Sequence, residues 1–235
     1  MNKSRVAQPF SATLPFALLL TLANSFLDAY TYLIRGGVFA TAQTGNVVFL
    51  AVQMSGGRPW AALAHLWPIV AFIAGVALAA HMKSGRLDRH FTYPLRWAIA
   101  LQVLVLLVIG FVPTSVPPSI LTIPIAFVSA LQIGLFRAIG DLAYVPIATT
   151  GNLLRFVESS YGGVADGSAT SRRAAFVYAA LIGTFCVGAL VGAVFSRHLE
   201  ERAIWLPAGL LGVTLLIYIA DDVFRRRKQR ALDVH

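Results

Sequence analysis

Long apolar runs separated by short polar segments dominate the chain between residues 12 and 221. A helix needs about 20 largely apolar residues to cross about 30 Å of hydrocarbon, so this pattern predicts membrane-spanning helices. Six runs qualify, at residues 12–34, 61–81, 96–112, 119–136, 174–195 and 203–221. The third and fourth runs are joined by the uncharged, proline-rich segment 113–118, which predicts a tight turn.

Composition supports this interpretation. The chain has 235 residues, of which 57% are hydrophobic and 12% charged, and its mean hydropathy is +0.73. That is about half the charge of an average soluble domain. We therefore expect a single all-α integral membrane domain over residues 1–235, a polytopic helix bundle whose solvent is the lipid bilayer. Lys3 and Arg5 before the first apolar run imitate a signal peptide, but the run continues to Ile34, which favours an uncleaved first span.

The basic residues predict the orientation of the chain. A net charge of +9 could suggest nucleic-acid binding, but that function needs a basic face on a soluble domain. Here the Lys and Arg residues lie between apolar runs, where a membrane protein holds them on the cytoplasmic side. Six spans with a cytoplasmic N-terminus leave only four of the 19 Lys and Arg residues outside, namely Arg35, Arg58, Arg197 and Arg202. Eight spans would instead place segment 83–96 outside, so six spans with both termini cytoplasmic is the prediction.

One short motif occurs twice. Thr44-Gly45-Asn46 recurs as Thr150-Gly151-Asn152, 106 residues later, and a Gly-Gly pair follows each copy at the same offset. Three spans accompany each copy, and because three is odd, the second copy must enter the membrane upside down. This predicts inverted repeats, an architecture of many transporters. Repeat one covers about residues 12–112 and repeat two about 119–221, followed by a basic cytoplasmic tail at 222–235.

Each T-G-N triplet is predicted to break a helix. Glycine supplies backbone freedom, and Thr and Asn side chains can cap the first N–H groups of the helix that follows. The apolar residues 47–52 after the first copy favour a re-entrant half-helix, whereas Arg155 and Glu158 after the second favour a helix along the interface. A helix N-terminus inside the membrane would suit an anion or a polar solute. Two ordinary helix starts are the alternative.

Polar residues in two spans identify the candidate site. In the first span they lie on one helical face, at Thr21, Asn24, Asp28, Thr31 and Arg35. An Asp inside a span costs about 2.5–3.5 kcal/mol on insertion scales, so this face is expected to look into the bundle. Asp28 would either pair with Arg35 or titrate as a proton-coupling carboxylate. The fourth span has a counterpart line at Thr122, Ser129 and Gln132, with Arg137 at its end, and Gln132 would be the pseudo-equivalent of Asp28.

The predicted solute-binding set combines these faces with both triplets. It consists of Asn24, Asp28, Thr44, Gly45, Asn46, Gln132, Thr150, Gly151 and Asn152, with Arg35 and Arg137 as charge partners. Small residues four apart, Gly75 with Ala79 and Gly188 with Gly192, predict close helix contacts, and Ala179 with Gly183 would extend the second stripe. Four tyrosines near the triplets are typical of an interface belt, namely Tyr30, Tyr32, Tyr144 and Tyr161.

No catalytic chemistry is predicted. The five histidines show no H-x-x-x-H or H-E-x-x-H spacing, and no G-x-S-x-G or phosphate-binding loop is present. The lone Cys186 excludes an intrachain disulfide and a cysteine-based zinc site. We therefore expect neither an enzyme, nor a metal, nor a cofactor.

Several of these residues together resemble a known family. Leu27-Asp28-Ala29, Gly37-Val38-Phe39, the two T-G-N triplets and Leu131-Gln132 look like the YoaK-like family of bacterial inner-membrane proteins. The resemblance covers nearly the whole chain and implies six spans and an inner-membrane location. That family is a domain of unknown function, so it implies no activity. Here Gln132-Ile133 stands where the family often carries Gln-Asn.

Two functions fit these observations. The leading hypothesis is a small-solute or ion permease, with Asp28 as the gate and the two triplets converging near the midplane. At 25.3 kDa the chain is small for a full alternating-access transporter, which favours a homodimer or a channel-like mechanism. The alternative is a non-catalytic membrane scaffold whose polar spans bind another membrane subunit.

Overall fold

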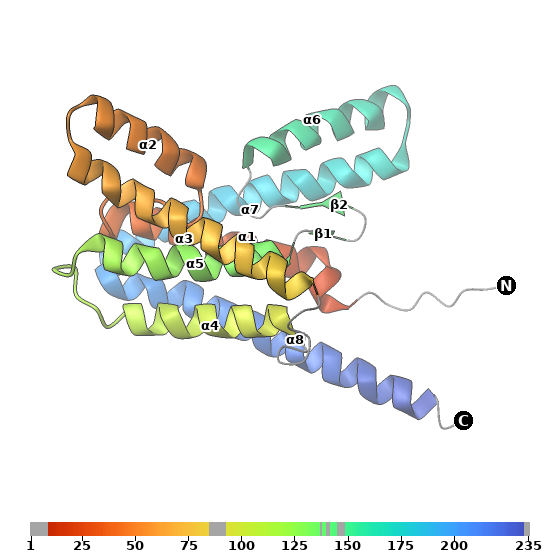
Figure 1. Ribbon diagram of the computed structural model, residues 1–235. Helices are drawn as coiled ribbons and strands as arrows, with labels where there is room; N and C mark the ends of the chain where they lie inside the picture. Colours follow the sequence, from red (N-terminus) through yellow and green to blue (C-terminus); the bar gives the residue numbers. More distant parts are fainter. Residues whose placement is uncertain (1–8, 85–92, 137, 140–141, 145–148, 233–235) are drawn as a thin grey trace.

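The computed structural model describes residues 9–84, 93–136, 138–139, 142–144 and 149–232, and these form a helix bundle (Figure 1). The first half contains η1 (Phe10–Ala12), α1 (Leu14–Ile34), α2 (Gln43–Ser55), α3 (Pro59–Lys83) and α4 (Pro94–Ile109). The second half contains α5 (Pro118–Leu135), α6 (Thr149–Ala165), α7 (Ala169–Leu199), η2 (Glu200–Ile204) and α8 (Trp205–Leu232). The strands β1 (Ala138–Ile139) and β2 (Leu142–Ala143) form a two-residue antiparallel pair. The predicted all-α class is confirmed.

Local sequence explains where several helices begin and end. Proline occupies the first turn of α1, α3, α4 and α5, where its missing N–H costs no helical hydrogen bond. Ser168 caps α7 by accepting a hydrogen bond from the backbone N–H of Ser171 (3.2 Å). The chain turns after α2 at Gly57, whose φ of 69° favours glycine.

The helices match the positions of the predicted spans, which correspond to α1, α3, α4, α5, α7 and α8. By length and composition, four segments in the described part of the chain could cross a membrane: α1, α3, α5 and the run Ala169–Lys228. That run comprises α7, η2 and α8, and Figure 1 shows α8 running back past α7 after η2. The 16-residue α4 is apolar but shorter, at about 24 Å.

Two helix pairs form the centre of the bundle. The first pair is α3 with α5 and the second is α1 with α7, while α4 packs on α5 and α8, and α8 also packs on α1. The α2–α3 and α6–α7 hairpins project on the same side of the bundle and lean apart (Figure 1). Buried Leu20, Leu106 and Ile125 lie in the main apolar core.

The predicted small-residue contacts are confirmed at two crossings. A Cβ added to Gly75 on α3 would lie 2.5 Å from the Phe127 carbonyl oxygen of α5. One added to Gly188 on α7 would overlap Ser25 of α1, and one on Gly192 would come within 2.8 Å of the Phe26 backbone. The predicted extension to Gly183 was wrong, because the space beside that residue is open.

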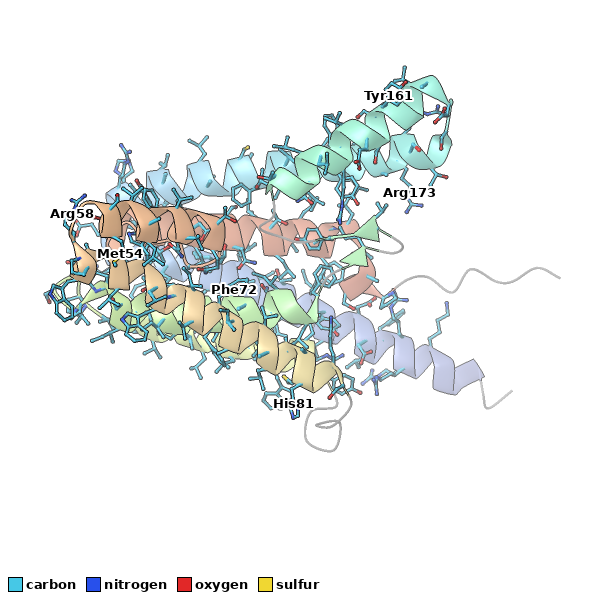
Figure 2. The ribbon with its side chains drawn as sticks, turned by 45° about the horizontal axis from the view of Figure 1, so that its top comes forward. Met54, Arg58, Phe72, His81, Tyr161 and Arg173 are labelled. Atoms are coloured by element: carbon cyan, nitrogen blue, oxygen red, sulfur yellow. The ribbon has the colours of Figure 1, made fainter. Side chains whose placement is uncertain are left out.

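Hydrogen bonds identify which elements share an end of the bundle. The backbone N–H of Phe10 donates to Asp221 Oδ2 (2.9 Å), so η1 lies beside the C-terminal part of α8. Arg96 at the start of α4 pairs with Asp222 at the same end (2.7 Å). Figure 2 places Met54 and Arg58 at one end of the molecule, and Tyr161 and Arg173 at the other.

Candidate functional site

The polar face of α1 is buried, as predicted. Asn24 and Thr31 are fully enclosed and Asp28 is only 4% exposed. On α5, Thr122, Ser129 and Gln132 are fully buried as well. Both polar lines therefore face protein rather than the surroundings of the bundle.

The carboxylate of Asp28 holds the loop between α1 and α2. Its Oδ1 accepts hydrogen bonds from the backbone N–H groups of Thr41 (2.7 Å) and Ala42 (3.3 Å). Its Oδ2 accepts a hydrogen bond from the Thr41 hydroxyl (2.6 Å). Asp28 thereby fixes the chain immediately before the first T-G-N helix.

Arg35 does not neutralise Asp28. Its Nε donates to the Tyr30 hydroxyl (2.9 Å), and its Nη2 and Nη1 donate to the carbonyl oxygens of Val112 (3.0 Å) and Pro113 (3.3 Å). Among the described residues no ion pair joins Arg35 to Asp28, so the ion-pair alternative was wrong. The carbonyl groups after α4 satisfy the guanidinium instead, and Arg35 ties α1 to the turn before α5.

The first T-G-N triplet shapes the same loop from the other side. Asn46 brackets Phe39, because its Oδ1 accepts from the Phe39 N–H (3.0 Å) and its Nδ2 donates to the Phe39 carbonyl oxygen (2.7 Å). Gly45 leaves room for the Phe39 ring, which would lie 2.6 Å from any Cβ at that position. Gln43 adds a hydrogen bond to the Ala40 carbonyl oxygen (3.0 Å). The triplet is thus a clamp for residues 39–42.

The predicted helix-capping role of the triplet was wrong for the first copy. The helix α2 starts after Ala42, whose methyl side chain has no oxygen to offer the first N–H groups. Thr44 lies inside the first turn and is exposed, while Asn46 faces back toward the loop. Tertiary contacts with Phe39 outweigh local capping here.

A pocket of about 410 Å³ opens beside this loop, between α1, residues 39–42 and α7. Asp28 and Ser25 line it with small alanines, and Tyr32 and Phe39 form an aromatic wall with stacked rings 5.2 Å apart. Exposed Arg197 near the end of α7 also lines it. The lining is predominantly apolar and aromatic, and Asp28 and Arg197 are its two charged residues.

The second triplet repeats the exposure pattern of the first. Thr150 is exposed, Gly151 is half-buried and Asn152 is buried, as are Thr44, Gly45 and Asn46 respectively. Arg155 of α6 lies over the Tyr178 ring of α7, 6.0 Å from its centroid. The predicted partner Arg137 lies outside the described residues.

Gln132 occupies a separate polar contact in the bundle. Its Oε1 accepts a hydrogen bond from Asn24 Nδ2 (3.0 Å), which joins α5 to α1. Neither Asn24 nor Gln132 lines the Asp28 pocket. The structure therefore brings Asp28, Gly45 and Asn46 together around one loop, but divides the predicted site into a pocket, an interior amide pair and the start of α6.

Sequence reasoning missed several residues of this region. Thr41, Tyr32 and Arg197 were not predicted as site residues, although Thr41 precedes the triplet by three residues and is a polar residue in an apolar stretch. The interface-belt assignment was wrong for Tyr30 and Tyr144, which are buried. The Tyr144 hydroxyl donates to the Ala17 carbonyl oxygen (2.8 Å). Within the described ranges, no group of three His, Cys, Asp or Glu side chains could hold a metal ion.

Comparison with known proteins agrees with these features. The family described as "Protein of unknown function (DUF1275)" matches residues 16–217. The "UPF0700 transmembrane protein YoaK" of Bacillus subtilis (strain 168) is 26% identical over 198 residues, which cover 82% of this chain and 88% of that protein. No solved structure matches the chain. The predicted resemblance to the YoaK-like family is confirmed.

Proposed function

We propose that this chain, which belongs to the DUF1275 family of transmembrane proteins of unknown function, is a permease for a small solute or ion. One observation carries the proposal: the carboxylate of Asp28 is buried at a pocket beside the start of the short helix α2. Burying Asp28 inside a span is costly, and such residues mark solute or proton pathways in membrane proteins. The proposal involves no catalytic step.

An inverted pair of repeats is part of the proposal. In this correspondence α1 to α4 match α5 to α8. The contact between α3 and α5 is then equivalent to the contact between α7 and α1, because in each the third helix of one repeat packs on the first helix of the other. Gly75 and Gly188 support this correspondence, because each lets its helix approach the first helix of the other repeat. Helices α4 and α8, the last of each repeat, pack against each other.

The first T-G-N helix, α2, would be a re-entrant half-helix, and α6, which carries Arg155 and Glu158, would lie along the interface. With 13 and 17 residues, α2 and α6 measure about 20 and 26 Å, short of the roughly 30 Å of hydrocarbon. Both begin near the middle of the bundle and run toward opposite ends of it (Figure 1). This is the arrangement in which transporters direct half-helix N-termini at a central site.

Six spans with cytoplasmic termini in the bacterial inner membrane complete the proposed topology. The hydrogen bond between Phe10 and Asp221 supports it, since it holds the first and last spans together at one end. Single cysteines at positions 58 and 173, introduced after Cys186→Ser, test the orientation with an impermeant thiol reagent on intact cells. Position 58 should react from outside and position 173 only after lysis; the reverse result would contradict the orientation.

The transport proposal is tested by flux into proteoliposomes. Solute-driven currents or uptake should disappear in Asp28→Asn while membrane abundance and thermal stability of the protein stay within the range of wild type. Asp166→Asn is the matched control, because Asp166 is an exposed carboxylate in the α6–α7 loop. Flux that survives in Asp28→Asn would contradict a role for this carboxylate in permeation.

A scaffold is the second candidate. The faces of α2 and α6 expose Val47, Val48, Leu153, Leu154 and Val157, each at least 46% uncovered. Lipid, a second copy of the chain or another membrane subunit could cover them. Purification in mild detergent distinguishes these: a stoichiometric foreign subunit favours the scaffold, and a homodimer with solute flux favours the permease.

A further inference from the structure

The pocket beside Asp28 is lined mainly by apolar and aromatic side chains, with Asp28 and Arg197 as its two charged residues. We propose that it binds a small zwitterion, with the ammonium group between Asp28 and the Tyr32–Phe39 rings and the carboxylate at Arg197. This inference names the ligand class of the proposed permease site and therefore rests on that proposal. The volume of about 410 Å³ lies near the lower end of the roughly 300–1,000 Å³ of small-molecule sites.

Asp28 retains capacity for one further donor. An ionised carboxylate offers about four acceptor positions on its two oxygens. Thr41 and Ala42 supply two donors to Oδ1, whereas only the Thr41 hydroxyl donates to Oδ2. The remaining position on Oδ2 suits an N–H of a primary ammonium group.

The aromatic wall is held rigidly for a cation. Tyr32 and Phe39 stack with an interplanar angle of 16°, and Phe49 lies 6.3 Å from both rings and stacks on His65 of α3. Asn46 fixes the backbone of Phe39 on its other side. The faces that the two rings turn toward each other are covered, so a cation would meet the outer face of the pair, and rings held by these contacts lose little entropy when a ligand binds.

Arg197 supplies the opposite charge at a suitable distance. Gly192 packs on Phe26, so Arg197, five residues later, lies near the level of residue 31 of α1. That is about 5 Å along the helix axis from Asp28. The side chain is exposed, and none of the ion pairs among the described residues involves it.

A zwitterion satisfies both charged groups at once. A simple cation would leave Arg197 facing its neutral end, and a simple anion would meet the Asp28 carboxylate. A ligand that leaves a charged group of the site unpaired binds much more weakly than a similar ligand that pairs with it. A short amino acid with its charges separated by several ångströms fits the spacing.

Three probes of equal chain length test the assignment: 4-aminobutanoate, n-butylamine and butanoate. Binding to the purified full-length protein in detergent is measured by calorimetry, without any flux. We expect 4-aminobutanoate to bind about tenfold or more tightly than either of the other two. It gains a charge-assisted hydrogen bond from its carboxylate relative to n-butylamine, and one from its ammonium group relative to butanoate.

Two variants assign the ends of the ligand. Arg197→Gln should weaken 4-aminobutanoate about tenfold without weakening n-butylamine, because only the carboxylate contact is lost. Tyr32→Leu should weaken both amines and leave butanoate unchanged. Arg202→Gln is the matched control, since Arg202 is an exposed arginine shortly after α7 that does not line the pocket, and it should bind as wild type does.

Three results would overturn the zwitterion assignment: equal binding of n-butylamine and 4-aminobutanoate, an unchanged affinity in Arg197→Gln, or binding of none of the probes. These outcomes are separable from failure of the permease proposal. Flux of another solute that Asp28→Asn blocks would keep the permease while rejecting the zwitterion. Zwitterion binding without flux would reject the permease alone.

Discussion

The two T-G-N regions carry the same triplet but differ in the residue that precedes it on the central helix. In the first region, Asp28 of α1 binds the loop before α2 and lines a pocket. In the second, the proposed counterpart on α5 is the neutral Gln132, which binds Asn24 inside the bundle. Both triplets nevertheless expose their Thr and bury their Asn.

This difference shows that the motif has a structural role, whereas the charged group of the site comes from another element. The first triplet positions a loop, since Asn46 and Gly45 contact Phe39. Charge enters through the preceding helix. In the proposed inverted repeat, one half would thus hold a charged site and the other an uncharged contact.

The largest effect is expected when Asp28, the charged member of the pair Asp28 and Gln132, is removed. Asp28→Ala leaves two N–H groups and one hydroxyl without acceptors in a buried place, and should lower the free energy of unfolding by about 3 kcal/mol or more. Gln132→Ala removes one hydrogen bond and should cost about 1 kcal/mol. Thermal unfolding of the purified variants measures both. Equal losses of stability in the two variants would contradict the different roles assigned to Asp28 and Gln132.

Next in size is the clamp itself. Asn46→Ala leaves the Phe39 N–H and carbonyl groups without their partner and should cost about 2–3 kcal/mol, with weaker binding of the proposed zwitterion. Hydrogen exchange of residues 36–42 should accelerate more than that of α8. Ser55→Ala, an exposed position on the same helix, serves as the control. Unchanged exchange in this loop would refute the clamp.

A smaller effect tests what the halves share. Gly188→Ala brings a Cβ against Ser25 and the Leu22 carbonyl oxygen, and Gly75→Ala brings one against the Phe127 carbonyl oxygen. Each should destabilise the protein by about 1–2 kcal/mol, because backbone must shift at a crowded crossing. Gly183→Ala, where the space is open, should not destabilise it. Denaturation midpoints measured in one detergent compare the three variants. A clear difference between Gly188→Ala and Gly75→Ala would contradict the equivalence of the two crossings.

The smallest effect concerns the contact between the last helices of the two halves. Burial alone would raise the pKa of Asp222, but hydrogen bonds from Arg96 and Arg226 prevail and hold it below its ordinary value. A lowered pKa stabilises the fold above the unfolded value of about 3.9, and this contribution is lost as pH falls through the lower folded value. Melting temperature should therefore fall below about pH 4, and less so in Asp222→Asn. Identical pH profiles would contradict the assignment.

Much of the fold could be predicted from periodicity and composition. The six apolar runs became helices at the predicted positions, because hydrophobic length alone decides which segments can leave water. The buried faces of α1 and α5 followed from their helical spacing and the cost of exposing polar groups to lipid. The close contacts at Gly75 and Gly188 followed from residue size.

The site could be predicted only in part, because its partners are distant in sequence. Asp28 and Asn46 were identified by residue type, but whether Asp28 meets Arg35 or Thr41 depends on where the α1–α2 loop folds back. Arg197 is 169 residues from Asp28, and no local pattern relates them.

The sequence by itself determined the class of protein, its helices and the polar faces that must be buried, since these depend on local hydrophobicity and helical geometry. Only the tertiary structure decided that Asn46 clamps Phe39, that Arg35 binds the carbonyl groups of Val112 and Pro113, and that α7 forms one wall of a pocket beside Asp28. Hydrogen-bond partners are chosen by proximity in space, and packing of whole helices sets that proximity.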